Sequence, residues 1–371
     1  MKIAFLSTFY PYRGGIAQFN AALYQSLALD YSVKAFNFSV QYPSLLFPGK
    51  TQYVEENDLA EKIDSERVLN SINPLTYRKT VNAIKRYDPD ILIVGYWMPF
   101  MAPSLGYVAK KLKKSCQVVA IVHNATPHES KKTDKVLNNY FFNRIDRFIA
   151  LSSAVKTDIL KDYPEAEVKV LLHPVYNHFG NCINQKEALI KMGLPEKNKY
   201  LLFFGLIRDY KGLDILLKAL TILDKSYHLV IAGEVYGDYS KYQKIIDENH
   251  LSERIHFFNY YIPDEDVKLF FSLADCCVLP YRSATQSGII AIAKHFNLPV
   301  VASNVGGLNE FITNKENGVL INTPSPENFA KVIDKIFREK DINHYRTKLK
   351  DEKNNNTWKN FAQQLIEFTL G

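Results

Sequence analysis

The stretch "RSATQSGIIAIAKHFNLPVVAS", residues 282–303, contains the structural unit from which the chain is built. Its end, "PVVAS", is a short apolar run typical of a buried strand, and "GIIAIAKHF" before it has the composition of a buried helix. Another apolar run, "DCCVLPY" at residues 275–281, comes directly before the stretch. The order strand, neutral turn, helix, strand predicts a crossover connection between two parallel strands.

The same alternation of apolar runs and helical patterns extends through the chain, which is typical of parallel sheets with crossover helices. In the first half the runs are "IAFLS" (3–7), "VKAFNF" (33–38), "DILIVG" (90–95), "QVVAIVH" (117–123), "RFIALS" (147–152) and "VKVLLHP" (168–174). In the second half they are "YLLFFG" (200–205), "YHLVIAGE" (227–234), "RIHFFN" (254–259), "DCCVLPY" (275–281), "PVVAS" (299–303) and "GVLIN" (318–322). We therefore expect an α/β fold with two doubly wound, Rossmann-like parallel sheets.

A polar segment around Gly180 and Asn181 separates the two series. We therefore expect an N-terminal domain over residues 1–177 and a C-terminal domain over residues 178–352, because 371 residues exceed one simple core. Residues 353–371 should form a terminal helix that packs back towards the first domain. Ligands of such sheets bind beyond the carboxyl ends of the strands, which predicts an active site in the groove between the domains.

Composition favours a soluble globular protein, with 47% hydrophobic and 23% charged residues. The four cysteines lack the paired spacing of a zinc site. Cys276 and Cys277 stand in an apolar run, which predicts buried free thiols and a reducing cytoplasm. Met1 leads directly into the strand pattern "KIAFLS", without the layout of a signal peptide, so the expected location is cytoplasmic.

Positive charge is concentrated in the first half of the chain. Residues 1–180 hold 22 Lys and Arg against 16 Asp and Glu, and "KKLKK" at residues 110–114 is the densest cluster. A solvated helix face explains such a cluster, and so does contact with an anionic membrane surface, where each basic residue contributes about 1 kcal/mol. The second reading allows peripheral association with the inner face of the cell membrane.

Residues 91–109 contain no charge and meet the length of a membrane-spanning helix. Gly95, Pro99 and Pro103 interrupt this segment, and "DILIVG" has the pattern of a buried strand. We therefore expect a strand, an aromatic loop "YWMPF" and a helix. Tyr96 and Trp97 in that loop could belong to the core or to an acceptor pocket.

The stretch "LLFFGLIRDYKGLDILLKAL", residues 201–220, has the features of an anion site. A buried strand ends at Gly205, and a loop with Arg208 and Lys211 precedes a helix that begins near Gly212. Free amide groups and the dipole at a helix start attract phosphate, and two cations beside them would clamp a diphosphate. At the end of the next strand, Gly233 and Glu234 leave room for a ligand or a neighbouring loop.

The neutral turn "SATQSG" can bind phosphate by the same means. Backbone amides of Ser287, Gly288 and Ile289 would point at the ligand, and the hydroxyls of Thr285 and Ser287 could add donors. The alternative is an ordinary N-cap, in which a Ser or Thr hydroxyl satisfies its own helix.

Taken together, "FFGLIRDYKGLD", "VIAGE", "DCCVLPYRSATQSGIIAIAKHFNLPVVAS" and "NVGGLNEFI" resemble the retaining glycosyltransferases of family 4, which have the GT-B fold. The resemblance extends to "PYRGGIAQFNAALYQSLA" near the start and to "IVHNATPH" in the middle, and so covers nearly the whole chain. It implies two Rossmann-like domains and a nucleoside-diphosphate sugar as the co-substrate.

The resemblance also implies roles for single residues. Arg208 and Lys211 match the pair that grips the donor diphosphate, and His123 matches a strand-end histidine that contacts the sugar; these three form the predicted catalytic set. The predicted donor-binding set is Gly14, Gly15, Gly205, Arg208, Lys211, Gly233, Glu234, Thr285, Gln286, Ser287, Gly288, Ile289 and Glu310. The predicted acceptor-binding set is Tyr96, Trp97, His123 and Asn124.

This sequence departs from the family in one place. Many members carry two glutamates eight positions apart around the turn, whereas "ATQSGIIAIAK" has no acid, and the stretch before Pro299 is one residue shorter than usual. The pattern is similar to that of a subgroup in which Thr285, Gln286 and backbone amides make the contacts. The residue that contacts the ribose therefore stays unassigned.

Other functional classes lack their motifs. HExxH, zinc spacing and a Walker loop are absent, and no G-x-G-x-x-G follows the first strand. "DPD" at residues 88–90 precedes a strand, which predicts a helix–strand turn and not the metal-binding Asp-x-Asp of other glycosyltransferases. An epimerase would need an acid/base pair, and a non-catalytic sugar-binding homologue would not need the two cations.

We therefore expect a metal-independent retaining transferase without a cofactor. It would move a hexose-type sugar from a UDP- or GDP-linked donor to a hydroxyl of a glycan or polyprenyl-linked acceptor in bacterial surface polysaccharide assembly, as in lipopolysaccharide, capsule or exopolysaccharide. No nucleic-acid partner is expected.

Overall fold

The computed structural model describes residues 1–43, 47, 51–55, 58, 60–126, 132–176, 178–314, 316–339, 341–352 and 357–371. The chain folds into two compact units. The first consists of Met1–Pro174 together with Asn356–Gly371, and the second of Val175–Asn355. The sequence-based boundaries were 177 and 352.

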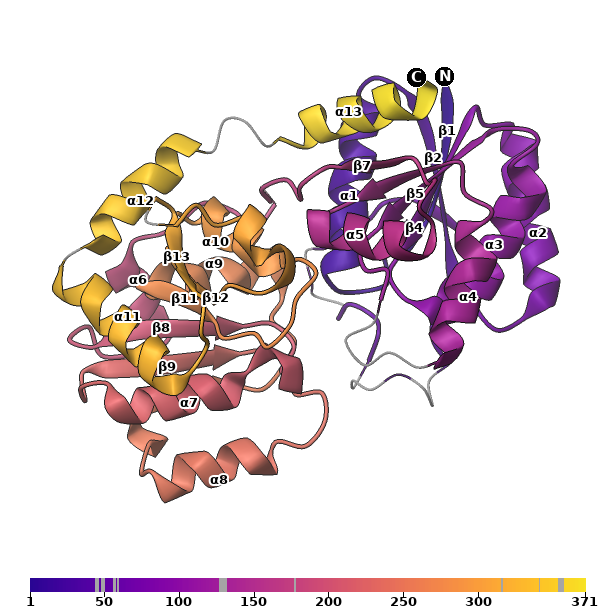
Figure 1. The fold of residues 1–371 in the computed structure, drawn as a ribbon. Helices are drawn as coiled ribbons and strands as arrows, with labels where there is room; N and C mark the ends of the chain where they lie inside the picture. The colour runs from indigo at the N-terminus through magenta and orange to yellow at the C-terminus, as the bar shows by residue number, and fades with distance from the viewer. Residues whose placement is uncertain are drawn as a thin grey trace. The chain divides into compact units, whose positions relative to one another are not determined.

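Within the described residues, the first unit has a parallel seven-stranded sheet in the order β3-β2-β1-β4-β5-β6-β7. Its strands are β1 (Lys2–Leu6), β2 (Ser32–Val40), β3 (Ser65–Asn70), β4 (Ile91–Tyr96), β5 (Gln117–Val122), β6 (Arg147–Ala150) and β7 (Val168–Val170). Its helices are α1 (Gly15–Ala28), η2 (Pro99–Met101), α2 (Pro74–Tyr87), α3 (Ala102–Leu112), α4 (Lys132–Phe142), α5 (Ser153–Asp162) and α13 (Trp358–Leu370). Figure 1 shows α1 and α13 on one face of the sheet and α2, α3 and α4 on the other.

The second unit has a parallel six-stranded sheet, in the order β10-β9-β8-β11-β12-β13 among the residues described. Its strands are β8 (Lys199–Phe204), β9 (Tyr227–Ala232), β10 (Ile255–Phe258), β11 (Cys276–Leu279), β12 (Val300–Ser303) and β13 (Gly318–Ile321). Its helices are α6 (Gln185–Lys191), η3 (Asp209–Lys211), α7 (Leu213–Ile222), α8 (Ser240–Glu248), η4 (Ser252–Arg254), α9 (Asp264–Leu273), α10 (Gly288–His295), η5 (Gly306–Glu310), α11 (Pro326–Arg338) and α12 (Asp341–Glu352). The predicted class, two doubly wound parallel sheets, is confirmed.

Local signals in the sequence explain where several helices begin. Asn73 caps α2 by accepting from the amide of Leu75, and Pro74 occupies the first turn, where a missing N–H costs nothing. Ser152 caps α5 and Ser325 caps α11 in the same way.

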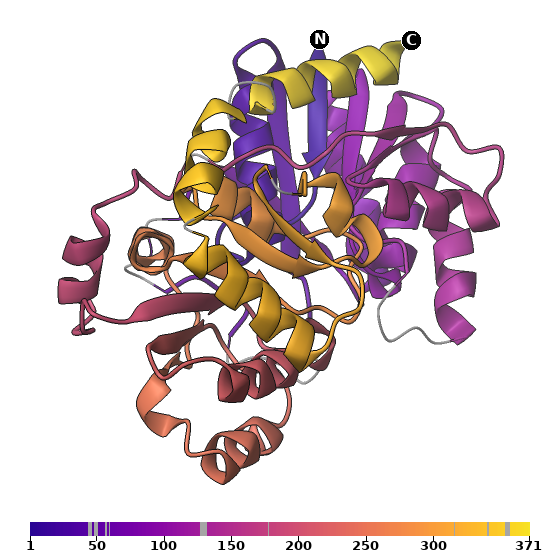
Figure 2. The same cartoon turned by 60° about the vertical axis from the view of Figure 1, so that its left-hand side comes forward.

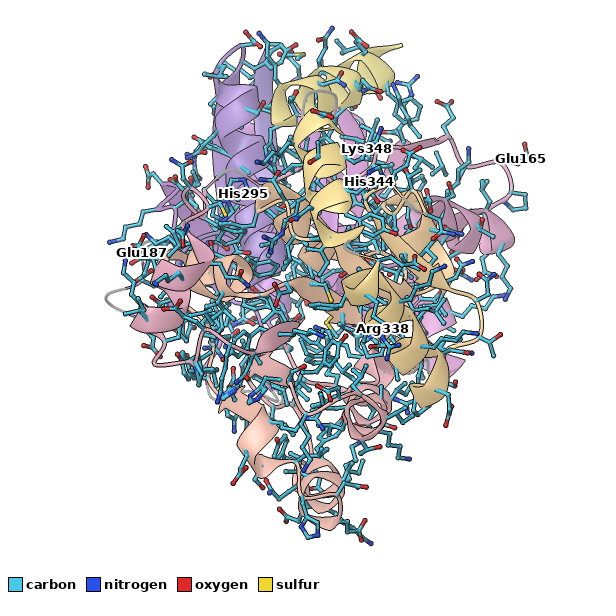
Figure 3. The ribbon with its side chains drawn as sticks, turned by 90° about the vertical axis from the view of Figure 1, so that its left-hand side faces the viewer. Glu165, Glu187, His295, Arg338, His344 and Lys348 are labelled. Carbon is cyan, nitrogen blue, oxygen red and sulfur yellow. The ribbon has the colours of Figure 1, made fainter. Side chains whose placement is uncertain are left out.

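The exposed faces of the last helices of the second unit carry charged side chains. Arg338, in the last turn of α11, pairs with Asp334, while His344 and Lys348 project from α12 (Figure 3).

The strand expected at residues 168–174 was too long. The run at residues 168–174 forms a strand only over Val168–Val170, although the amide of Leu171 still donates to Ala150. Pro174 has no amide hydrogen and cannot extend the ladder.

The uncharged segment at residues 91–109 divides into β4, η2 and most of α3, and no described helix is long and apolar enough to cross a bilayer. Cys276 and Cys277 are buried free thiols, as predicted.

The C-terminal helix α13 belongs to the first unit and packs against α1 (Figure 2). Phe19 of α1 is the centre of the contact, because its ring meets the rings of Trp358 and Phe361 edge-on at 5.1 and 5.6 Å. Leu365 of α13 is fully buried, whereas Leu370 of the same helix is 60% exposed. The last residues of the chain therefore complete the core of the first unit.

Replacing Leu365 with Ala should lower the unfolding free energy of the first unit by about 2–5 kcal/mol, since the truncation leaves a cavity. Leu370→Ala is the matched control and should change it by less than about 0.5 kcal/mol. Both tryptophans, Trp97 and Trp358, lie in this unit, so tryptophan fluorescence during urea unfolding reports it selectively. Equal effects of the two variants would contradict the packing described.

Candidate functional site

The strand order of the second unit reverses at β8, because β9 lies on one side of it and β11 on the other. In doubly wound sheets, ligands bind beyond the carboxyl ends of the strands at this switch point. The loops that follow β8 and β11 carry most of the predicted donor residues, among them Lys211 and Ser287. The switch point is therefore where the candidate site is built.

Lys211 is the buried cation of this site. It ends the 3-10 turn η3 and is only 8% exposed, unlike Arg208 at the start of the same turn. A Cβ atom added to Gly205 would lie 3.1 Å from Lys211 Nζ and 3.3 Å from Ile289 Cδ1. The end of β8, the Lys211 ammonium and the first turn of α10 thus meet at one point.

No acidic side chain among the residues that the structure describes forms an ion pair or hydrogen bond with Lys211. Burial first, and then the positive charge of Arg208, lower the pKa of Lys211 to about 8. Arg208 is exposed and places its guanidinium 5.1 Å from the ring centre of Tyr236. A buried ammonium without a counter-charge costs several kcal/mol, so this arrangement favours an anionic ligand.

The start of α10 supplies amide donors to the same place. Ser287 occupies the N-cap position and is buried, yet its side chain accepts no hydrogen bond from the helix amides. The ordinary N-cap alternative is therefore not what the structure has. Gln286, the preceding residue, has a buried Oε1 atom without a partner among the described residues. The backbone amides suit an anionic ligand, and the unsatisfied oxygen of Gln286 can accept a hydrogen bond from a hydroxyl of that ligand.

Glycines let the loops at this edge pack backbone against backbone. Gly306 has φ +53° and a Cβ atom on it would lie 1.6 Å from the carbonyl oxygen of Ala284. A Cβ atom on Gly233, at φ +147°, would lie 2.2 Å from the carbonyl oxygen of Gly205. Side chains at these two positions would separate the loops, so Gly233 has a packing role that its sequence position alone left open.

Arg282 connects the two loops and was missed by the sequence analysis. Its amide donates to Tyr210 over 2.7 Å, and its guanidinium donates to the carbonyl of Asp209 over 2.8 Å. The same guanidinium forms an ion pair of 2.6 Å with Asp214. Arg282 therefore fixes the turn that carries Lys211 relative to the turn that carries Ser287. No sequence signal pointed to this role, because an arginine that follows a strand is usually an ordinary surface charge.

Other predicted donor residues lie at the same edge. Glu234 is buried after β9, and its carbonyl accepts from the amide of Ile207 over 2.9 Å. Glu310 ends η5 after β12 and is partly buried, as is Thr285 in the loop before α10. The structure thus brings the predicted residues of the second unit together at one edge of its sheet.

The remaining predicted residues belong to the first unit. Gly14 has φ 108° and precedes α1, where Gly15 is the first residue. A Cβ atom on either glycine would meet nothing within 4 Å, so the turn is open in the structure described. The two glycines stand directly after the loop that follows β1, which is the switch point of this sheet.

His123 follows β5 and is 5% exposed, with its ring 4.9 Å from that of Phe19. Burial, with a smaller contribution from His173, lowers the pKa of His123 to about 3. The imidazole is therefore neutral at physiological pH. Its Nε2 atom and the Oδ1 atom of Asn124 are buried and lack partners among the described residues.

Tyr96 and Trp97 belong to the hydrophobic core of the first unit. Tyr96 is fully buried, stacks on Phe141 with ring centres 4.3 Å apart, and donates its hydroxyl to Asn138. The indole nitrogen of Trp97 donates to the hydroxyl of Tyr42 over 2.7 Å. Of the two roles open from sequence, both side chains have the core role, because both are buried in the hydrophobic cluster of the first unit.

The "DPD" sequence forms a turn between α2 and β4, as predicted. Asp88 ends α2 in the left-handed conformation, and Asp90 accepts from the amide of Lys2 over 2.7 Å. Among the residues that the structure describes, no group of three or more His, Cys, Asp and Glu is arranged to hold a metal ion.

Two family models match this chain. Residues 184–356 match the family described as "Glycosyl transferases group 1", and residues 51–176 match "Glycosyltransferase Family 4". An uncharacterized glycosyltransferase of Methanocaldococcus jannaschii is 24% identical over 351 residues, which are 92% of this chain and 90% of that protein.

Solved structures share the fold. The Anabaena protein HepE in complex with UDP-glucose aligns with a TM-score of 0.78 at 16% identity, over 99% of this chain and 98% of that one. The lipopolysaccharide outer core galactosyltransferase WaaB aligns with a TM-score of 0.67 at 18% identity, over 99% of both chains. The first unit thus matches a glycosyltransferase family 4 domain, the second matches a glycosyltransferase group 1 domain, and the two parallel-sheet units have the GT-B glycosyltransferase fold.

Proposed function

We propose that this glycosyltransferase moves a hexose-type sugar, with retention of configuration, from a nucleoside-diphosphate sugar to a hydroxyl of a glycan or lipid-linked acceptor. The observation that carries the proposal is the buried ammonium of Lys211, which has no acidic partner among the described residues and lies beside the first turn of α10. A diphosphate supplies the negative charge that this position lacks.

Relatives support the kind of donor and the biological role. HepE binds UDP and UDP-glucose, and WaaB is a galactosyltransferase of the lipopolysaccharide outer core. By analogy we infer a UDP-linked hexose as the donor, with a GDP-linked sugar as the alternative. The same analogy supports a role in bacterial surface polysaccharide assembly.

The second unit acts on the leaving group. As the bond between the anomeric carbon and the diphosphate breaks, negative charge grows on the diphosphate oxygens. Lys211, Arg208 and the amides of Gly288 and Ile289 stabilise that charge, and they are already oriented before the reaction. This stabilisation is greater in the transition state than in the ground state, and so raises the rate without a metal ion.

The first unit supplies the acceptor side. The turn at Gly14 and Gly15 leaves the backbone accessible to a sugar, and neutral His123 can exchange hydrogen bonds with sugar hydroxyls. A histidine with such a low pKa is a poor general base, so we propose that a diphosphate oxygen takes the proton of the attacking hydroxyl on the same face of the sugar. Asn124 adds a further polar contact.

Lys211→Met should weaken donor binding strongly. We expect kcat/KM to fall by about 100-fold or more, because one cation of the diphosphate site is lost. In the wild-type protein, affinity for a nucleoside-diphosphate sugar should fall as pH rises above about 8, where Lys211 loses its proton. Titration calorimetry with UDP- and GDP-linked sugars measures the loss of affinity and its pH dependence, and initial rates of donor turnover measure kcat/KM. The control is Lys218→Met, which changes an exposed lysine of α7. Near-normal binding by Lys211→Met would overturn the proposed donor site.

The same variant should be more stable than the wild type when no ligand is bound. Below pH 8 both folded and unfolded Lys211 are protonated, and the cost of burying the charge is about 3 kcal/mol. Between pH 8 and the ordinary lysine pKa the unfolded state binds the extra proton, so wild-type stability rises with pH in this window. Lys211→Met lacks this rise and gains stability at pH 7. Urea unfolding followed by circular dichroism tests this, and a less stable variant would contradict it.

A basic face on the first unit supports peripheral membrane contact. Helices α2 and α3 lie side by side, with the rings of Tyr77 and Tyr107 5.8 Å apart (Figure 1). Leu75 is 77% exposed at the start of α2. The name basic face is used for the exposed cations that lie on these two helices or directly after α3 and have no acidic partner among the described residues: Arg78, Lys79, Lys85, Lys110, Lys111 and Lys114. We propose that it contacts anionic lipid headgroups.

Flotation with liposomes tests this contact. The protein should float with anionic vesicles and not with zwitterionic ones, and salt should release it. Replacing Lys110 and Lys111 together with Gln should weaken binding by roughly 30-fold, from about 1 kcal/mol per residue. Lys186 and Lys191, each paired with a glutamate in the second unit, are the control pair for the same change. Binding that is insensitive to salt would discard the proposal.

A further inference from the structure

The loops that follow the first strand of each sheet are held in different ways. In the second unit, the loop after β8 continues to pair with the chain after β9 through backbone groups. The amide of Gly205 donates to Ala232, that of Ile207 to Glu234, and that of Tyr236 to Ile207, all within 3.0 Å. In the first unit, the backbone ladder between β1 and β2 ends earlier, at the bond from the Ser7 amide to Phe36.

Beyond that bond, the side chain of Asn37 takes the place of the backbone. Its Oδ1 atom accepts from the amides of Phe9 and Phe38, over 3.2 and 2.7 Å. Its Nδ2 atom donates to the carbonyls of Phe9 and Tyr10, over 3.1 and 3.0 Å. One amide side chain therefore pairs with both backbone groups of Phe9, as a neighbouring strand would.

The position of Asn37 in β2 makes this possible. The pairing of β2 with β3 is irregular beside Asn37: its register shifts between Asn37 and Phe38, where β3 has Val68 as an extra residue, as in a bulge. Bulges re-aim side chains and are common beside active sites. Asn37 is completely buried in an otherwise apolar stretch, and a buried amide is retained at low cost only where its donors and acceptors are all used.

Other buried polar groups hold the rest of the loop. Thr8 donates its hydroxyl to Gln41 over 2.6 Å, and Asn20 of α1 donates to the carbonyl of Thr8 and to the hydroxyl of Ser7, each over 2.8 Å. A Cβ atom on Gly95 would lie 2.1 Å from the hydroxyl oxygen of Ser7, so only glycine fits there. The loop from Ser7 to Arg13 is thus fixed before the chain reaches Gly14 and Gly15.

We infer that Asn37 is a positioning residue for the transfer reaction: its amide holds the loop after β1 and so sets where the turn at Gly14 and Gly15 stands. The inference rests on the proposed function, in which that turn meets the sugar. Asn37 itself touches no substrate and acts through the backbone of Phe9 and Tyr10. Displacements of about 1 Å can cost about 100-fold in rate, which is why a buried amide far from the reacting atoms can matter.

Asparagine is the side chain that this position requires. It must accept hydrogen bonds on one atom and donate them from the other, within the space of a short side chain. Aspartate has nearly the same shape but has no donor for the carbonyls of Phe9 and Tyr10, and would set a carboxylate oxygen against them. Asn37→Asp is therefore a change of hydrogen bonding at nearly constant volume.

The experiment compares Asn37→Asp with the wild type in three measurements. Hydrogen exchange in the peptide over residues 7–15 should speed up about 10-fold or more as the loop loosens. The kcat for sugar transfer should fall about 10- to 100-fold. Affinity for UDP, a ligand of the second unit in our proposal, should stay within about twofold of the wild type.

Two further variants complete the design. Thr8→Val removes only the bond to Gln41 and should loosen the same peptide to a smaller extent, which keeps the test usable if Asn37→Asp fails to fold. Tyr77→Phe is the matched control, since it removes a buried bond of 2.7 Å to the carbonyl of Ser71 in the same unit without touching the loop. It should change neither loop exchange nor kcat.

The outcomes separate this inference from the proposed function. Unchanged exchange of residues 7–15 in both Asn37→Asp and Thr8→Val would overturn the inference, and so would a loosened loop with unchanged kcat. Absence of nucleoside-diphosphate binding by the wild type would instead overturn the proposed function. Loop exchange would still decide whether Asn37 holds the loop.

Discussion

The buried positive charge of Lys211 is the constraint on which the candidate site depends. An ammonium with 8% exposure is costly unless an anion joins it, and the described part of the chain supplies none. Two neighbouring features suit that missing anion: the amide donors in the first turn of α10 and the exposed guanidinium of Arg208. The fold maintains this unfavourable charge by fixing the turn around it, chiefly through Arg282 and its ion pair with Asp214.

The two sheets hold the loop at their switch point with different hydrogen-bonding groups. Each sheet must hold the loop that follows its first strand, β1 or β8, because this strand has a neighbour on either side and its loop lies at the switch point. The second unit uses backbone pairing and two glycines at which a Cβ atom would strike a carbonyl oxygen. The first uses buried amide side chains, Asn37 and Asn20, beyond the backbone bond from Ser7 to Phe36. A rigid loop at each switch point holds the backbone that faces the ligand in one position.

The fold could be predicted from sequence to a large extent, since apolar runs and capping residues mark strands and helices locally. The strand at residues 168–174 was too long because an apolar run does not reveal where ladder bonds stop. In the site, Arg208, Lys211 and the turn before α10 were found because strand–loop–helix order places their backbone at one edge. Arg282 and Asn37 were not, because their partners lie far away in the sequence. For Asn37 a weak signal existed: one amide within an apolar run.

The sequence by itself determined the order of strands and helices, the class of both sheets and the residues that stand at the strand ends, because these follow from local periodicity. Only the tertiary structure decided which of those residues are buried, neutral or unpaired. Tyr96 and Trp97 lie in the core, His123 is a neutral imidazole, and Lys211 is a charge without a counter-ion among the residues described. The physical reason is that burial and charge compensation depend on what other segments bring to the same point, and no local pattern contains that information.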